Sequence, residues 1–356
     1  MEIKKFNEST MLARFQVGEV VLAPLVVRNA RLRGVNCDPE ADTRVELAIP
    51  RTSEGFHFVV ACKSRSTPES IRSAIRQVKK VVMEGEWPMI QVPYLSPEAL
   101  EELEKESVSG VDLCKNGVVI VPGRLYILRS GQSNEYRDSR PLNNPYRGRS
   151  AMVARTLLQS PHWSSLTELA AAVGTTGEKL SLPQVSKAVQ AQKEDLIVSK
   201  HMGTITLIDP LRLLDKLGRE WRMPAVQRRI SLRMRLDGGW ARALSSETSL
   251  RWAVTGESSV ARYAMFSQGG PQHLAVSDAS LAMTILQGKP EPVPNFADLE
   301  LIETDSPGFY FGNEIDDNGV RWASRLQTWL ELQAGDARQQ DAARGLRKQL
   351  LEGVRP

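Results

Sequence analysis

The chain has 356 residues, of which 41% are hydrophobic and 25% charged, which is ordinary for a globular protein and enough for two or three domains. No apolar run approaches the roughly 20 residues that a membrane-spanning helix needs, and the first residues lack the apolar core of a secretion signal. We therefore expect a cytoplasmic protein without a membrane partner.

The basic charge is concentrated in the middle of the chain. Residues 151–240 carry 13 Lys and Arg against 8 Asp and Glu, whereas residues 241–356 carry 11 against 15. A local basic excess is the electrostatic signature of a segment that binds nucleic acid. The acidic last third is expected to face a protein partner or simply solvent.

Strands that alternate with helices predict an α/β domain over residues 1–130. A helix is expected to open at Ser96, with Pro97 in its first turn and Glu98 favoured there by the helix dipole. The other predicted elements are a helix over 69–83 and strands over 44–49, 56–62, 88–93, 117–121 and 124–128.

Two neighbouring strands of this domain carry residues typical of a nuclease site. Such a site needs acids on adjacent strands to bind Mg²⁺ and a lysine beside the second acid. Glu46 lies on the first strand and Lys63 follows the second, but Cys62 stands where the second acid would be, and a thiol is a poor Mg²⁺ ligand. Gln77, in the next helix, fits a position where these nucleases often carry glutamine.

The N-terminal domain thus resembles the restriction-endonuclease-like fold of the PD-(D/E)xK superfamily, in a version that has lost a metal ligand. The resemblance implies an inactive domain with no metal and no cofactor. The alternatives are an unrelated α/β domain and an active Mg²⁺-dependent nuclease. The active nuclease would use Glu46, Lys63 and either Asp38 or Asp42.

Residues 131–149 are rich in Ser, Asn, Pro, Gly and Arg, lack apolar periodicity and are expected to form a linker. Either this linker follows DNA through its arginines or it is a solvated loop. The arginines are Arg137, Arg140, Arg147 and Arg149.

Residues 150–217 predict a winged helix-turn-helix. An apolar helix over 151–158 is followed by a second helix that Ser165 caps, with Glu168 in capping-box position and Gly174 as its stop. A third helix begins at Leu182, and two β-rich runs then surround a turn at residues 201–203. In this motif the third helix enters the major groove and the wing touches the DNA backbone.

The exposed face of the third helix supplies the candidate DNA contacts. Gln and Ser side chains bond base edges, and Lys meets phosphates. The residues expected to contact bases are Gln184, Ser186, Lys187 and Gln190, and those expected to hold the backbone are Lys193, Lys200 and His201. The partner would be double-stranded DNA, bound by a homodimer on a palindromic site. The alternative is a winged helix that docks a protein.

Residues 218–356 predict a C-terminal α+β domain. A helix is expected over 260–264 and a strand over 308–311, and the arginine-rich stretch 228–235 is either a phosphate-contacting ribbon or a solvated strand. The turn over 255–259 leads from a strand into a helix, so it either holds a phosphate on its backbone or is an ordinary capped turn.

Several stretches of the middle and last thirds resemble the AbiEi family of antitoxin regulators from type IV toxin–antitoxin systems. The motifs that carry the resemblance are Val111–Gly117, Leu207–Leu214, Trp252–Ser259, Trp322–Ser324 and Trp329–Arg338. The resemblance implies a DNA-binding repressor whose C-terminal domain counters a nucleotidyltransferase-type toxin.

The sequence therefore predicts an α+β multidomain protein. Its parts are an N-terminal α/β domain, a linker, a central winged helix-turn-helix and a C-terminal AbiEi-like α+β domain. We expect a sequence-specific transcriptional regulator that is not an enzyme.

Overall fold

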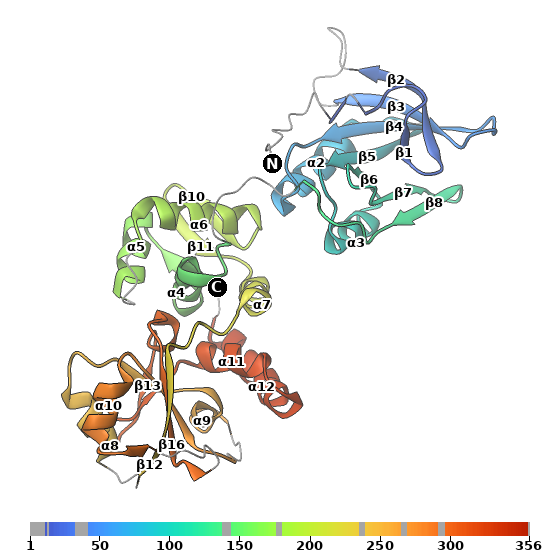
Figure 1. Ribbon diagram of the computed structural model, residues 1–356. Coiled ribbons are helices and arrows are strands. Elements are labelled where there is room, and N and C mark those ends of the chain that lie inside the picture. The colour runs from blue at the N-terminus through green and yellow to red at the C-terminus, as the bar shows by residue number, and fades with distance from the viewer. Residues whose placement is uncertain are drawn as a thin grey trace. The chain divides into compact units, whose positions relative to one another are not determined.

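A computed structural model describes residues 11–12, 14–32, 42–136, 144–175, 180–234, 239–264, 269–290 and 296–354. They form two compact units, one over residues 1–142 and the other over most of residues 143–356 (Figure 1). Helices and strands occur in both units, as the sequence predicts for an α+β protein. Within the described ranges, no helix is both long and apolar enough to cross a bilayer.

The first unit is built on one eight-stranded sheet in which the strands follow each other in chain order. The strands are β1 (Val20–Leu22), β2 (Leu25–Leu32), β3 (Thr43–Ala48), β4 (Gly55–Cys62), β5 (Glu86–Val92), β6 (Ser109–Asp112), β7 (Gly117–Val121) and β8 (Leu125–Arg129). Neighbours are antiparallel except for β4 with β5 and β5 with β6. Parallel neighbours need crossover connections, which α2 (Pro68–Val81) and α3 (Pro97–Lys105) supply.

The sheet is curled and has a hydrophobic core on each face. Alternate residues of a strand point to opposite faces, so Val59 and Ala61 of β4 pack with α2 and α3, whereas Phe58, Val60 and Cys62 join the other core. Because β4 is buried on both faces, its sequence is an almost unbroken apolar run.

The expected start of α3 is confirmed. The Ser96 hydroxyl accepts a hydrogen bond from the backbone N–H of Ala99 at 3.2 Å, Pro97 occupies the first turn and Glu98 lies beside it. The cap satisfies one of the N–H groups that the first turn leaves unpaired.

The first half of the second unit is mostly helical. It contains the 3₁₀ turn η1 (Gly148–Ser150), α4 (Ala151–Gln159), β9 (His162–Trp163), α5 (Leu166–Thr175), α6 (Leu182–Glu194), β10 (Val198–His201), β11 (Thr204–Leu207) and α7 (Pro210–Glu220). The three short strands form a sheet in the order β10-β11-β9. This half therefore has the three helices and the hairpin that the sequence predicts for residues 150–217.

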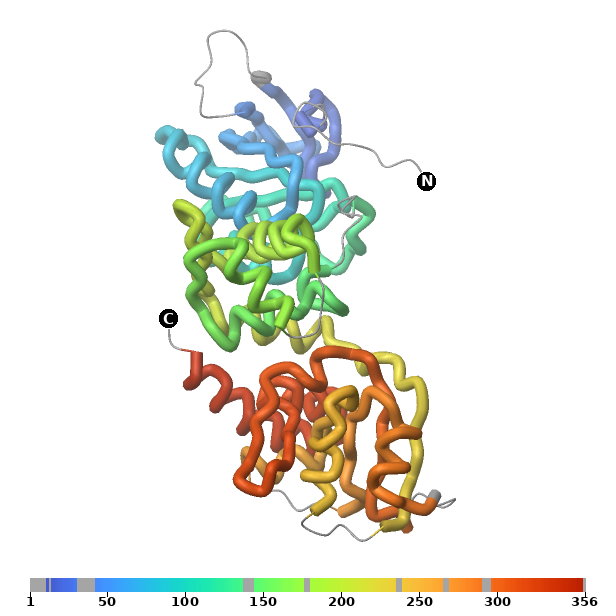
Figure 2. Tube along the Cα trace, turned by 90° about the vertical axis from the view of Figure 1, so that its left-hand side faces the viewer, coloured from blue at the N-terminus to red at the C-terminus, as the bar shows by residue number. Residues whose placement is uncertain are grey.

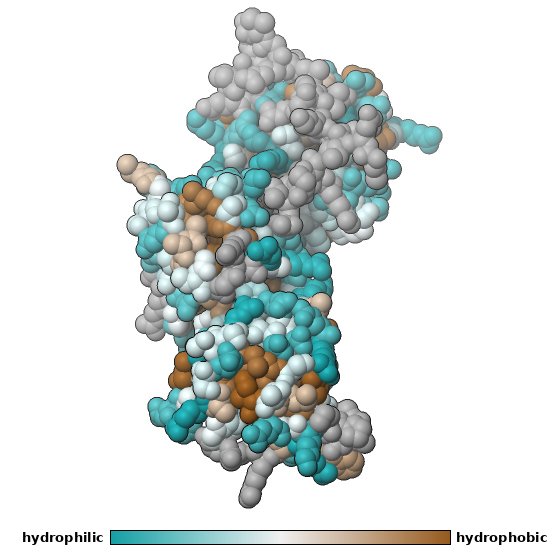
Figure 3. Space-filling model, turned by 60° about the vertical axis from the view of Figure 1, so that its left-hand side comes forward, coloured by the Kyte–Doolittle hydropathy of each residue, from teal (hydrophilic) through white to brown (hydrophobic). Residues whose placement is uncertain are grey.

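The second half surrounds a mixed sheet in the order β15-β12-β16-β14-β13-β18-β17. Its strands are β12 (Arg228–Arg233), β13 (Trp252–Val254), β14 (Gln272–Val276), β15 (Lys289–Pro290), β16 (Leu299–Glu303), β17 (Glu314–Ile315) and β18 (Arg321–Trp322). Its helices are α8 (Trp240–Ser246), α9 (Gly256–Val260), α10 (Ala279–Leu286), the 3₁₀ turn η3 (Pro307–Phe309), α11 (Arg325–Gln333) and α12 (Ala337–Gly353). Figure 3 shows hydrophobic side chains at the surface of this half, on the side that carries α8 and α10 in Figure 1.

The two halves of the second unit share one hydrophobic core. Leu157 of α4 and Leu214 of α7 lie in the same cluster of buried side chains as Leu330 of α11 and Leu346 of α12. Figure 2 shows α12 (red) running back from the sheet toward the green helices of this unit. Residue 217, the expected domain boundary, therefore lies inside α7, in the core that the two halves share.

Two expected elements of the second half are wrong. The helix expected over 260–264 is α9, which begins at Gly256 and ends at Val260. The strand expected over 308–311 is replaced by η3, where Pro307 opens a 3₁₀ turn and the Gly308 carbonyl oxygen accepts a hydrogen bond from Arg155.

The arginine-rich stretch 228–235 contains an internal strand of the sheet, β12. Ile230 and Leu232 are buried, and β12 is paired with both β15 and β16. The guanidinium of Arg229 forms an ion pair with Glu300, and Arg228 donates a hydrogen bond to the Ser280 hydroxyl at 2.9 Å. Through these contacts the arginines of β12 stabilise the sheet and its packing against α10. They therefore favour a structural strand over a phosphate-contacting ribbon.

Glu300 is expected to make the stability of the second unit sensitive to acid. His273, 3.6 Å away, and Arg229 hold the pKa of the Glu300 carboxyl at about 2, below its ordinary value of 4.5. A depressed folded-state pKa contributes stability that is complete above the ordinary pKa and is lost as the pH falls toward 2. We expect Glu300→Gln to cost on the order of 1–3 kcal/mol at pH 7 and much less near pH 2. Urea unfolding at both pH values measures this, and an equal cost at both would contradict the expectation.

Candidate nucleic-acid interface

Helix α6 presents one polar face because its hydrophobic residues repeat at helical spacing. Val185, Ala188 and Val189 are buried in the core of the second unit. Lys187 and Gln190 are exposed, and residues three apart on a helix are neighbours on its surface. These two side chains therefore form an adjacent cation and amide on the outer face.

Gln184 has a structural role at the start of α6. Its side-chain oxygen accepts hydrogen bonds from the backbone N–H of Ser181 at 2.8 Å and from the Ser181 hydroxyl at 3.0 Å. An amide oxygen accepts two hydrogen bonds, and the paired contact with adenine needs that oxygen as well as the nitrogen. The capping contact, which the spacing Ser181-x-x-Gln184 signals in the sequence, therefore competes with the expected base contact of Gln184.

Two other residues of α6 that are expected to contact DNA are less exposed. Ser186 and Lys193 are half-buried, so they lie at the edge of the exposed face rather than at its centre. Of the four residues expected to contact bases, Lys187 and Gln190 have the placement that base contact requires.

The wing is a tight hairpin whose turn exposes its tip. Val198 pairs with Leu207 and His201 with Thr204, so the turn consists of Met202 and Gly203, which have φ values of 47° and 91°. Two positive φ values are typical of the two-residue turns that match the twist of a hairpin. Lys200 and His201 are exposed beside this tip, as the sequence predicts.

Met202 is a surface feature that the sequence interpretation missed. Its side chain is 91% exposed at the very tip of the wing. The signal in the sequence was its place beside Gly203 between two β-rich runs, which is the place of a hairpin turn.

The start of α5 is capped nearly as predicted. The Ser165 hydroxyl accepts from the backbone N–H of Glu168 at 3.1 Å, but the Glu168 carboxylate reaches the backbone N–H of Ser164 at 3.0 Å, not that of Ser165. Bonds from the Ser164 hydroxyl and N–H lower the pKa of Glu168. The helix continues to Thr175, one residue beyond the expected stop at Gly174.

The arginines of the expected linker fall into two groups. Arg147 and Arg149 are exposed on and next to η1. Arg137 and Arg140 lie outside the described residues.

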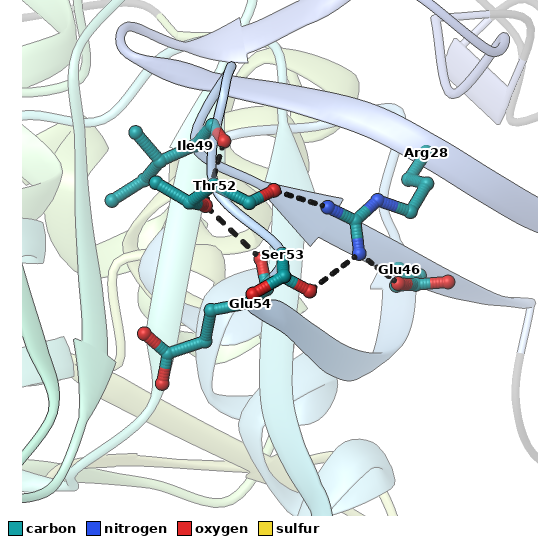
Figure 4. Close-up of polar contacts among 6 residues, drawn as sticks. All are labelled: Arg28, Glu46, Ile49, Thr52, Ser53 and Glu54. Carbon is teal, nitrogen blue, oxygen red and sulfur yellow. Dashed lines mark hydrogen bonds and ion pairs between the residues drawn. The ribbon is translucent and has the colours of Figure 1, made fainter.

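The structure does not bring Glu46 and Lys63 together. Glu46 pairs with His57 across β3 and β4, six positions from Lys63 along the chain, which corresponds to roughly 20 Å of extended strand. Figure 4 shows Glu46 in contact with Arg28, whose Nη1 lies 3.0 Å from a Glu46 oxygen. The nuclease pair expected from the sequence is therefore wrong, because strand register separates the two side chains.

Asp42 and Gln77 are the expected residues that do lie near Lys63. The Lys63 ammonium donates to the Gln77 side-chain oxygen at 2.7 Å, and an Asp42 carboxylate oxygen accepts from the backbone N–H of Cys62 at 2.8 Å. Cys62 itself is buried against Gln91. Asp38 lies outside the described residues, and the described part of the chain has no group of three His, Cys, Asp or Glu arranged to hold a metal ion.

The turn over 255–259 is occupied by a carboxylate of the protein itself. Glu331 of α11 accepts a hydrogen bond from the Thr255 hydroxyl at 2.7 Å and another from the Gly256 backbone. Ser258 and Ser259 are buried and bonded to neighbouring strands and helices. A carboxyl group of the protein therefore already takes the Gly256 donor that a phosphate would use, which favours a structural turn over a phosphate site.

Comparison with known proteins gave no match to a protein-family model, to a curated protein or to a solved structure.

Proposed function

We propose that the protein is a sequence-specific regulator of transcription that binds double-stranded DNA through α6 and the β10–β11 wing. The observation that carries the proposal is the outer face of α6, where Lys187 and Gln190 are exposed side by side while the opposite face is buried. Lysine and glutamine donate to phosphates and to base edges in the major groove, and a single helix fits that groove.

The order of elements supports a winged helix-turn-helix. Helix α4, strand β9, helices α5 and α6 and the β10–β11 hairpin follow the order of that motif, with the short strand β9 paired to the hairpin. In this arrangement the hairpin tip lies beside the groove-binding helix, so Lys200 and His201 would hold the backbone. Two copies would then bind half-sites about one helical turn apart.

The test of the proposal is competition between a specific duplex and random duplex of equal length. Selection of DNA fragments by the purified protein supplies the specific sequence. The proposal requires a preference of about a thousandfold or more, which is the range of specific regulators. Equal affinity for both would leave the winged helix as a protein-docking module.

Lys200→Ala is expected to weaken binding to all sequences about equally. The wing lysine would neutralise a phosphate, and loss of one such contact lowers the slope of log affinity against log salt by about one. Titrations at several salt concentrations measure the slope, and Lys348→Ala on α12 is the control for the loss of one exposed charge. An unchanged slope for Lys200→Ala would show that the wing does not contact the DNA backbone.

We extend the proposal to an antitoxin that binds a nucleotidyltransferase-type toxin, as the resemblance to the AbiEi family implies. Several residues that carry the resemblance are internal: Trp252, Ser259 and Trp329 are all buried. They define the fold of the C-terminal half rather than a binding surface. The test is co-elution of this protein with a nucleotidyltransferase encoded by a neighbouring gene, and separate elution of the two would limit the proposal to DNA binding.

A further inference from the structure

The second unit contains a cavity that the proposed DNA interface does not use. Its volume is about 560 Å³, and it lies between η1, the start of α4, the end of α7 with the segment that follows, and the residues around η3. The residues that matter here are Tyr146, Arg147, Arg149, Arg155, Trp221 and Arg222. No residue of α6 or of the wing lines it.

The cavity carries an excess of positive charge. Four arginines line it, against the two carboxylates of Glu220 and Asp305. Arg155 is bonded to Gly308 and Gln327 inside the protein, so the excess rests on Arg147, Arg149 and Arg222. A concave surface with one sign of charge concentrates ions of the opposite sign.

Two of the arginines approach the cavity from different parts of the chain. Arg147 precedes η1 and Arg222 follows α7, and both are exposed. The Arg222 guanidinium donates to the carbonyl oxygens of Arg219 and Trp221, at 2.9 and 2.6 Å, which fixes it at the end of α7. Guanidinium groups suit phosphates because their fork of N–H donors matches two oxygens at once.

The rest of the wall mixes polar groups with apolar and aromatic ones. Met152, Leu217 and Leu330 are buried, Tyr146 is almost fully buried with Lys216 over its ring, and Trp221 is half-buried. Flat aromatic groups bind other flat rings, and ligand pockets combine such a wall with a few convergent polar groups.

We propose that this cavity binds a nucleotide, with the phosphate held by Arg147 and Arg222 and the base against the half-buried ring of Trp221. The volume lies within the roughly 300–1,000 Å³ typical of small-molecule sites. The proposal stands apart from DNA binding, because a ligand here can be measured without DNA.

Isothermal titration of the intact protein with AMP, GMP, CMP and UMP, each tested separately, decides the matter. We expect at least one of them to bind, and Arg147→Ala with Arg222→Ala to weaken it at least about a hundredfold, since each charge-assisted contact is worth about tenfold or more. Arg242→Ala, an exposed arginine of α8, removes one charge elsewhere and should leave the affinity unchanged.

Failure of all four nucleotides to bind, or equal affinity of the double variant, would overturn the proposal. Inorganic phosphate that binds as tightly as the nucleotides would overturn the role given to Trp221. The double variant is also expected to keep its affinity for DNA. Loss of DNA affinity without nucleotide binding would assign these arginines to DNA.

Discussion

Replacement of both Lys187 and Gln190 by alanine is expected to remove most of the preference for the specific DNA sequence. Each side chain is exposed on the outer face of α6, and a good contact to a base edge is worth about 1–3 kcal/mol of discrimination. The two losses together correspond to about 2–6 kcal/mol, or thirtyfold and more in relative affinity. Competition between specific and random duplexes, followed by fluorescence anisotropy, measures the ratio.

The choice of variants distinguishes a loss of base recognition from damage to helix α6. Gln184→Ala is unsuitable for this purpose, because it removes the cap that the Ser181 N–H and hydroxyl form with Gln184. Lys348→Ala on α12 is the charge control. If the double variant folds normally and discriminates as well as the parent protein, α6 does not contact the bases.

Arg155→Ala is expected to destabilise the second unit by about 3–5 kcal/mol, the usual cost of removing one partner from a buried charged network. Arg155 lies on α4 and is only 6% exposed. Its Nη1 donates to the Gly308 carbonyl at 3.2 Å and its Nη2 to the Gln327 side-chain oxygen at 2.8 Å. Burial lowers the pKa of Arg155 to about 10, so the side chain is still charged at neutral pH.

The cost is large because the Gly308 carbonyl and the Gln327 side chain each lose the donor that Arg155 supplies. The network continues from Gln327 to Glu331, where burial raises the pKa of the carboxyl, and from there to Thr255. Urea unfolding followed by circular dichroism measures the change, with the exposed Arg242→Ala as control. A change within about 0.5 kcal/mol, as at an ordinary surface position, would show that the contact does not hold the two halves together.

The same contact would link stability to DNA binding. Helices α4 and α7 share their core with α11 and α12, so loosening of Gly308 and Gln327 against Arg155 disturbs the support of α6. Arg155→Ala is therefore expected to lose DNA affinity at temperatures where it is partly unfolded and to keep it where it is folded.

Local sequence signals predicted the helices better than the short strands. Caps such as Ser96 and Ser165 lie next to the helices that they open, so the pattern is visible within a few residues. Strands β1 and β6 were not predicted, because they have only three and four residues, too few for a clear alternation, and β2 was missed although it has eight. The neighbours with which these strands pair are determined by the complete sheet and not by the local sequence.

The placement of the candidate residues could be predicted where the pattern is local and not where it depends on distant pairing. Lys187 and Gln190 were predicted correctly as exposed, since helical spacing around Val185 and Val189 fixes which side is buried. Glu46 was misplaced relative to Lys63, because the register between β3 and β4 depends on pairing that no local pattern encodes. The arginine cavity was missed because Arg147 and Arg222 are 75 positions apart in the sequence.

The most direct test of the central claim is the affinity of the purified protein for the DNA upstream of its own gene, relative to random DNA of equal length. The measurement is made at two salt concentrations with Mg²⁺ present. We expect preferential binding that weakens as salt rises, with the DNA left intact. Equal affinity for both DNAs, or no binding at either salt concentration, would contradict the account, and cleaved DNA would show that the protein is a nuclease.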